Sequence, residues 1–157
     1  MNNNKPKPLK NPISVLVVLH DPNGDILLLE RADKADFWQS VTGSVETGET
    51  PFQTALREIA EETGIVLTPE QLHDWHYSSV YEIYPHWRHR YPAGVSENLE
   101  HVFSACIARD AVLDLTEHTA YQWLPAEQAA KLAFSPSNQE AILRLSEQRK
   151  LAHSSKS

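Results

Sequence analysis

The sequence predicts an α/β domain built on a mixed sheet. Its 157 residues, 41% of them hydrophobic, suit one domain with a buried core. Two strand-like runs come first and flank the turn signal at 21–24, so the sheet begins with an antiparallel hairpin and is not all parallel. A helical segment between later strands, with more helices at the end, favours layered α/β architecture.

Local patterns place the elements in order. Residues 1–12 are polar and hold three prolines, which predicts a mobile arm. A single domain is expected over 13–149, and a frayed tail over 150–157. Strands are expected at 13–19, 25–30, 74–84, 97–108 and 120–124, and 37–41 leads toward the central helix. Later helices are expected at 125–132 and 136–148, and 85–96 is expected to be irregular.

The central helix carries clear start and stop signals. Thr50 is the expected N-cap, Pro51 suits the first helical position, and Gly64 stands where a C-terminal cap belongs. Apolar residues recur at helical spacing and predict a core-facing stripe of Phe52, Ala55, Leu56 and Ile59.

Three glutamates share another surface of this helix. Glu58, Glu61 and Glu62 stand at i, i+3 and i+4, where like charges repel, although Arg57 can offset this by reaching Glu61. Clustered hard oxygens suit Mg²⁺ or Mn²⁺, and Mg²⁺ is usually shared with substrate phosphates. A solvated acidic face is the other reading of the run. The preceding loop of Gly43, Gly48 and Glu49 favours the metal site, because glycine lets backbone oxygens approach a cation.

This stretch resembles the Nudix box. The nine defined positions of that motif are matched by Gly43, Glu49, Arg57, Glu58, Ile59, Glu61, Glu62, Gly64 and Ile65. The resemblance implies hydrolysis of a nucleoside diphosphate linked to another group, on an α/β/α sandwich with a loop–helix–loop box. It further implies metal ligation by the three glutamates and the Gly43 carbonyl, with Glu58 as a general-base candidate. Arg57 and Glu49 would orient these groups.

Composition limits the partners. Fourteen Lys and Arg residues against 21 acidic ones give a net charge of −7, which argues against non-specific nucleic-acid binding. The N-terminus lacks the apolar run of a signal peptide, and no run is long enough to span a bilayer, so a cytoplasmic protein is expected. Cys106 is the only cysteine; within an expected strand it is interpreted as a buried structural thiol. The oligomeric state is left open.

Basic and aromatic residues outside the box are candidates for substrate binding. Arg88 and Arg90 can clamp phosphates, or belong to a solvated loop. Arg31 is a further phosphate ligand or an ordinary partner of Asp33 or Asp36. Trp38 can stack on a flat heterocycle, or pack in the core.

Motifs around the box resemble one bacterial Nudix subfamily, which acts on dihydroneopterin triphosphate in folate biosynthesis and also accepts dATP. They lie at 37–46, at 89–91 with 94–95, and at 116–118 with Tyr121 and Trp123. By this resemblance Arg31, Glu58, Glu62 and Glu117 line the site. Glu117 is then an extra ligand or base, and otherwise an ordinary turn residue. The alternative functions are those of a dNTP pyrophosphohydrolase, a dinucleoside tetraphosphate hydrolase, and a non-catalytic ligand-binding regulator.

Overall fold

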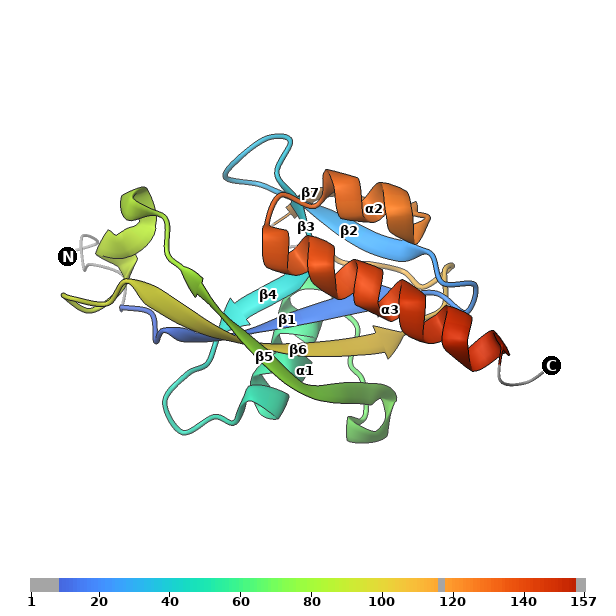
Figure 1. Ribbon diagram of the computed structural model, residues 1–157, viewed down its shortest axis with the longest axis horizontal. Coiled ribbons are helices and arrows are strands. Elements are labelled where there is room, and N and C mark those ends of the chain that lie inside the picture. Colours follow the sequence, from blue (N-terminus) through green and yellow to red (C-terminus); the bar gives the residue numbers. More distant parts are fainter. Residues whose placement is uncertain (1–8, 116–117, 155–157) are drawn as a thin grey trace.

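The fold is a seven-stranded mixed sheet between helices (Figure 1). The computed structural model describes residues 9–115 and 118–154. The strands are β1 (Ile13–His20), β2 (Ile26–Arg31), β3 (Trp38–Gln39), β4 (Val41–Ser44), β5 (Leu72–Glu82), β6 (Glu97–Cys106) and β7 (His118–Leu124). The α-helices are α1 (Pro51–Thr63), α2 (Ala126–Leu132) and α3 (Pro136–Ser154), and two 3₁₀ helices are η1 (Pro69–Gln71) and η2 (Pro85–Arg90).

The central strand β1 makes the sheet mixed. It runs parallel to β6 and antiparallel to β2 and β4, while β5 extends the sheet beyond β6 and β7 pairs with β2. The strand order β3-β2-β1-β6-β5 therefore contains the antiparallel hairpin that the turn at 21–24 predicts. The expected α/β fold with a mixed sheet is confirmed.

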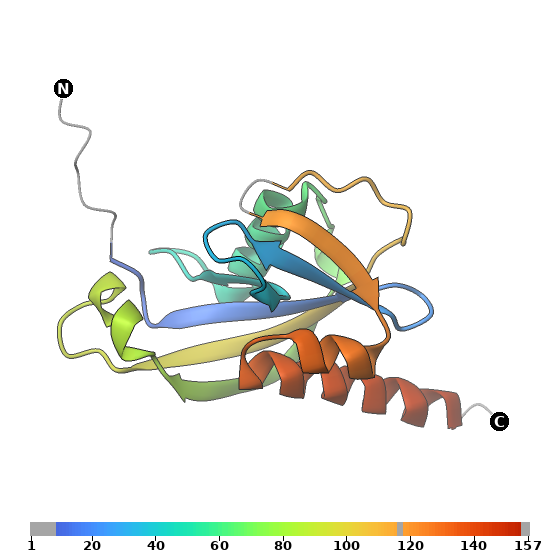
Figure 2. The ribbon, with the colours of Figure 1, turned by 90° about the horizontal axis from the view of Figure 1, so that it is seen from above.

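Two apolar clusters fill the two faces of the sheet. On one face Val15 and Val17 of β1 contact a cluster that includes Ala55 and Ile59 of α1. On the other face Leu16 and Val18 belong to a cluster with buried residues of α2 and α3. Alternation along β1 thus sends neighbouring side chains to opposite layers. Figure 2 shows α1 on one side of the sheet and the α2–α3 pair on the other, which is the predicted α/β/α sandwich.

Some boundaries differ from the sequence expectations. Residues 85–90 of the segment expected to be irregular form η2, and α3 continues past 148 to Ser154. Within the expected arm, the Lys10 N–H donates to the Arg90 carbonyl and the Asn11 amide donates to the Val45 carbonyl. The last residues before β1 are therefore attached to the domain.

The expectation of a buried Cys106 is wrong. Its side chain is exposed at the end of β6. A hollow lies there between the strand end and the last turns of α3, lined by Cys106 together with His20, His73 and Arg149. Helical cover is incomplete at this point, so the thiol is open to solvent. In the described part of the chain, no helix has the length and apolar character needed to cross a bilayer.

Candidate active site

The helix α1 forms as its end signals predict. Thr50 and Gln53 make a reciprocal capping box, with the Gln53 N–H donating to the Thr50 hydroxyl (3.2 Å) and the Thr50 N–H donating to the Gln53 side chain (2.9 Å). At the other end Gly64 takes φ of 78°, and its N–H donates to the Ala60 carbonyl. These caps fix which turn carries the glutamates.

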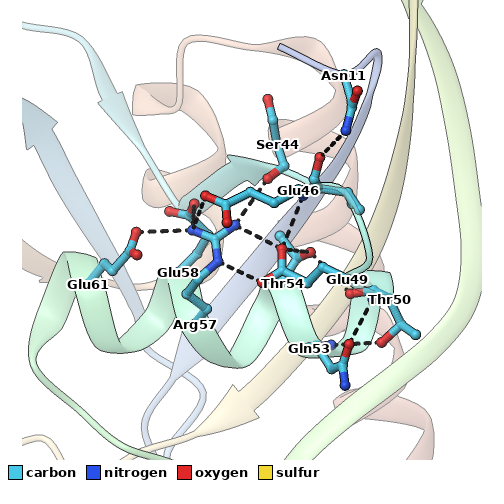
Figure 3. Close-up of polar contacts among 11 residues, drawn as sticks. Asn11, Ser44, Glu46, Glu49, Thr50, Gln53, Thr54, Arg57, Glu58 and Glu61 are labelled. Atoms are coloured by element: carbon cyan, nitrogen blue, oxygen red, sulfur yellow. Dashed lines mark hydrogen bonds and ion pairs between the residues drawn. The ribbon is translucent and has the colours of Figure 1, made fainter. Parts of the chain in front are cut away.

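Arg57 is the centre of a polar network on this helix (Figure 3). Its guanidinium binds Glu49 in a bidentate manner, at 2.8 Å from Nε and 3.0 Å from Nη2. Nη1 also donates to Glu58 (2.8 Å) and Glu61 (3.2 Å), and Nη2 donates to the Ser44 carbonyl (3.2 Å). One cation therefore joins the loop, β4 and the acidic helix face, which is the orienting arrangement that the resemblance implies.

Glu49 is the strongest partner of this network. Hydrogen bonds from the Arg57 guanidinium lower the pKa of Glu49 to about 2, and the Thr54 hydroxyl donates to the same carboxylate at 2.6 Å. The Glu46 N–H contributes a further bond of 3.1 Å. A carboxylate bound this firmly stays ionised, so it anchors Arg57 and does not exchange protons near neutral pH.

Gly43 lets Glu58 approach the backbone of β4. A Cβ atom built on Gly43 would overlap the carboxyl group of Glu58, so only glycine leaves room for this contact. The side chain of Glu58 is mostly buried, with 12% exposed. Burial is the main cause that raises the pKa of Glu58, and the charge of Glu61 acts in the same direction. The surroundings of Glu58 thus favour its protonated form more than those of an exposed glutamate do.

Glu62 lies deeper than the other two glutamates. It is 2% exposed, and its carboxyl is hydrogen-bonded to that of Glu58. His118 of β7 is also buried and places Nε2 3.5 Å from Glu62 Oε1. Sequence reasoning gave His118 no role of its own. Its place beside Glu117 was the available signal, but the register of β7 on β2 brings it to Glu62.

The substrate candidates outside the box are divided between several places. Arg31 is paired in register with His118, near Glu62; it binds Asp33 at 2.6 Å and lies 5.5 Å from the Trp87 ring. Arg88 donates to Glu82 and to the Ile83 carbonyl, which ties it to the end of β5. Arg90, in η2, is half-buried.

Two further candidates do not join the box. Trp38 packs on the apolar cluster of α2 and α3, on the sheet face opposite α1. This is the core-packing alternative for Trp38. Glu117 lies outside the described residues.

Comparison with known proteins identifies the family. The NUDIX domain profile matches residues 10–145. This chain belongs to the Nudix family. It is 46% identical to the dihydroneopterin triphosphate diphosphatase of Escherichia coli K12 over 141 residues, covering 88% of this chain and 94% of that protein. The enzyme of the same name from Haemophilus influenzae is 38% identical over 136 residues, which cover 85% of this chain and 86% of that protein.

A solved structure shows the same Nudix fold. The E. coli dihydroneopterin triphosphate pyrophosphohydrolase matches with a TM-score of 0.83 and 45% identity, covering 88% of this chain and 97% of that one. A mouse asymmetrical bis(5'-nucleosyl)-tetraphosphatase is more distant, at 30% identity over 112 residues, covering 69% of each chain.

Nudix hydrolases generally use divalent metal ions, and the donor set here fits one. Glu58 and Glu62 bring two carboxylates into contact beside the open backbone of Gly43, which favours a hard cation between them. The Glu61 carboxylate turns to Arg57 instead. Within residues 9–115 and 118–154, no three acidic, His or Cys side chains converge closely enough to hold an ion, so Glu61 would have to turn toward the pair.

We expect Glu49→Gln to destabilise the Nudix domain by about 1–2 kcal/mol at pH 7, because it removes a charged partner of Arg57 at a partly solvated site. The folded pKa of about 2 lies below the ordinary 4.5, so this stabilisation is full above pH 4.5 and is lost as pH falls toward 2. Urea unfolding at several pH values from 7 to 3.5 measures it. A difference between the two proteins that does not shrink in acid would contradict this account.

Proposed function

We propose that this Nudix hydrolase converts dihydroneopterin triphosphate to dihydroneopterin monophosphate and pyrophosphate, with Mg²⁺, as a cytoplasmic step of folate biosynthesis. One observation carries the proposal: 46% identity to the E. coli dihydroneopterin triphosphate diphosphatase extends over 94% of that enzyme. The intact box network around Arg57 supports catalysis over a purely ligand-binding role, because all three candidate metal-ligand glutamates are present. We also expect side activity on triphosphates such as dATP.

The roles of the box residues follow from their surroundings. Glu58, Glu61 and Glu62 would hold Mg²⁺ with the Gly43 carbonyl, and Glu117 is a further candidate ligand. When bound, Mg²⁺ neutralises phosphate charge and lowers the pKa of a bound water. Arg57 and Glu49 keep the glutamates in position.

Proton transfer needs a base near the attacked phosphorus. Glu58 or Glu117 would take a proton from the attacking water as the bond between phosphates breaks. The buried setting of Glu58 raises its pKa, which brings this carboxyl closer to neutral pH and makes it a better base. Arg31, near His118 and Glu62, is the phosphate-binding residue best placed to assist, once it exchanges Asp33 for substrate.

The proposal is tested by a substrate panel. Purified protein with Mg²⁺ is offered dihydroneopterin triphosphate, dATP, GTP and diadenosine tetraphosphate, and products are identified by chromatography. We expect the highest kcat/KM for dihydroneopterin triphosphate, with pyrophosphate released. A higher value for dATP or for the dinucleotide would instead identify a dNTP pyrophosphohydrolase or a dinucleoside tetraphosphate hydrolase.

A further inference from the structure

A group of buried polar side chains lies on the sheet face opposite α1. Asn98 and Glu100 point to this face from the start of β6, and Ser14 of β1 pairs in register with Glu100. Their exposed fractions are 0%, 4% and 6%. The Asn98 amide donates to the Ser14 hydroxyl at 2.7 Å, and Glu100 is hydrogen-bonded to Ser137 in the first turn of α3. None of these four residues has a part in the chemistry proposed at the box.

Two oxygen atoms in this group have no donor. Among the residues that the structure describes, neither Glu100 Oε1 nor Asn98 Oδ1 has a hydrogen-bond partner. Both atoms are acceptors, and an unsatisfied buried acceptor is costly, above all on a carboxylate. Burial raises the pKa of Glu100, and the hydrogen bond with Ser137 acts in the opposite direction. A partner that satisfied both atoms would have to supply two N–H or O–H donors.

Strand β4 connects this polar group to the box. Ser14 pairs with Ser44 of β4, and the Ser44 carbonyl accepts from Arg57 on the opposite side. Among the described strands β4 pairs only with β1, so its other edge is unpaired. A substrate with its phosphates at the box would have to cross this edge of the sheet to bring its ring to Glu100. Tyr81 is hydrogen-bonded to Ser14 and is 37% exposed, so one neighbour of the group reaches the protein surface.

We propose that Glu100 and Asn98 bind the heterocycle of the substrate through the edge that carries its ring N–H and its exocyclic amino group. The identity of the ring rests on the proposed function, since a pterin presents these two donors side by side. Adenine presents a ring nitrogen acceptor beside its amino group. That nitrogen would face a lone pair of the carboxylate, and two acceptors repel each other. The pair thus selects a 2-amino-4-oxo pyrimidine ring over adenine.

The test compares substrates in a Glu100→Gln variant. Glutamine keeps the size of the side chain but replaces one acceptor by a donor that opposes the ring N–H. We expect kcat/KM to fall about 10- to 100-fold for dihydroneopterin triphosphate and less than about threefold for dATP. The matched control is Glu97→Gln, an exposed position in the same strand, which should change neither substrate. Equal losses on both substrates would overturn the inference.

Binding of the ring alone separates this inference from the proposed function. Neopterin, which has the same edge but no phosphate, is titrated into the wild-type protein and the Glu100→Gln variant, with adenosine as the comparison ligand. Neopterin should bind the wild type at least tenfold more tightly than the variant, even if the triphosphate is not hydrolysed. If neopterin binds both proteins equally, or neither, the assignment of Glu100 is wrong. If the variant does not fold, binding of adenosine as tightly as neopterin to the wild type overturns it.

Discussion

Replacing Glu62 by Gln is expected to lower kcat by about 10³-fold while the fold is retained. Glutamine matches the shape of Glu62, which is almost fully buried, but it carries no charge for a divalent cation. The contacts to Glu58 and His118 can persist as neutral hydrogen bonds, so the melting temperature should shift by only a few degrees. Pyrophosphate release with saturating Mg²⁺ measures the rate, and Mn²⁺ titration measures metal affinity.

Glu46→Gln is the control for removing a carboxylate near the box. Glu46 is 68% exposed and 3.7 Å from Arg57. Surface ion pairs of this kind contribute about 0–1 kcal/mol, so activity should stay within twofold of the wild type. A Glu62→Gln variant that keeps more than a tenth of wild-type kcat and normal metal affinity would remove Glu62 from the candidate ligands.

The box helix was predictable because its signals are local. Thr50, Pro51 and Gly64 act on neighbours a few residues away, and the observed α1 begins and ends where they require. The Arg57–Glu61 contact, four residues apart, is local as well. Fold class followed from the order of such elements, and the Nudix resemblance followed from the spacing inside this single stretch.

Long-range register was beyond the sequence. The approach of His118 to Glu62 depends on how β7 pairs with β2, and the approach of Gly43 to Glu58 depends on how β4 packs against α1. Glu100 lies in a segment correctly expected to be a strand, yet its burial and its hydrogen bond with Ser137 of α3 depend on contacts far along the chain. The expectation of a buried Cys106 was wrong for the same reason, because the local sequence pattern does not reveal where the helices stop covering the sheet.

Gly43→Ala is expected to lower kcat by about 100-fold and to weaken metal affinity about 10-fold with little loss of stability. The added methyl group would occupy the place of the Glu58 carboxyl. Because the displaced atoms are the end of a flexible side chain, Glu58 can turn away and the backbone need not move. That turn would break the 2.8 Å bond to Arg57 and separate Glu58 from Glu62. Rate, Mn²⁺ affinity and melting temperature are measured together.

Gly48→Ala, in the loop before α1, is the control, because it should lower stability and not kcat. A methyl group there would have no atom within 4 Å, but the φ of 82° strains an L-residue. It should cost about 1–2 kcal/mol of stability and leave kcat nearly unchanged. The Gly43 effect should also vanish when Glu58 is already Ala, because no carboxyl remains to be displaced. Full additivity of the two substitutions would show that Gly43 acts by another route, through its own carbonyl or the path of β4.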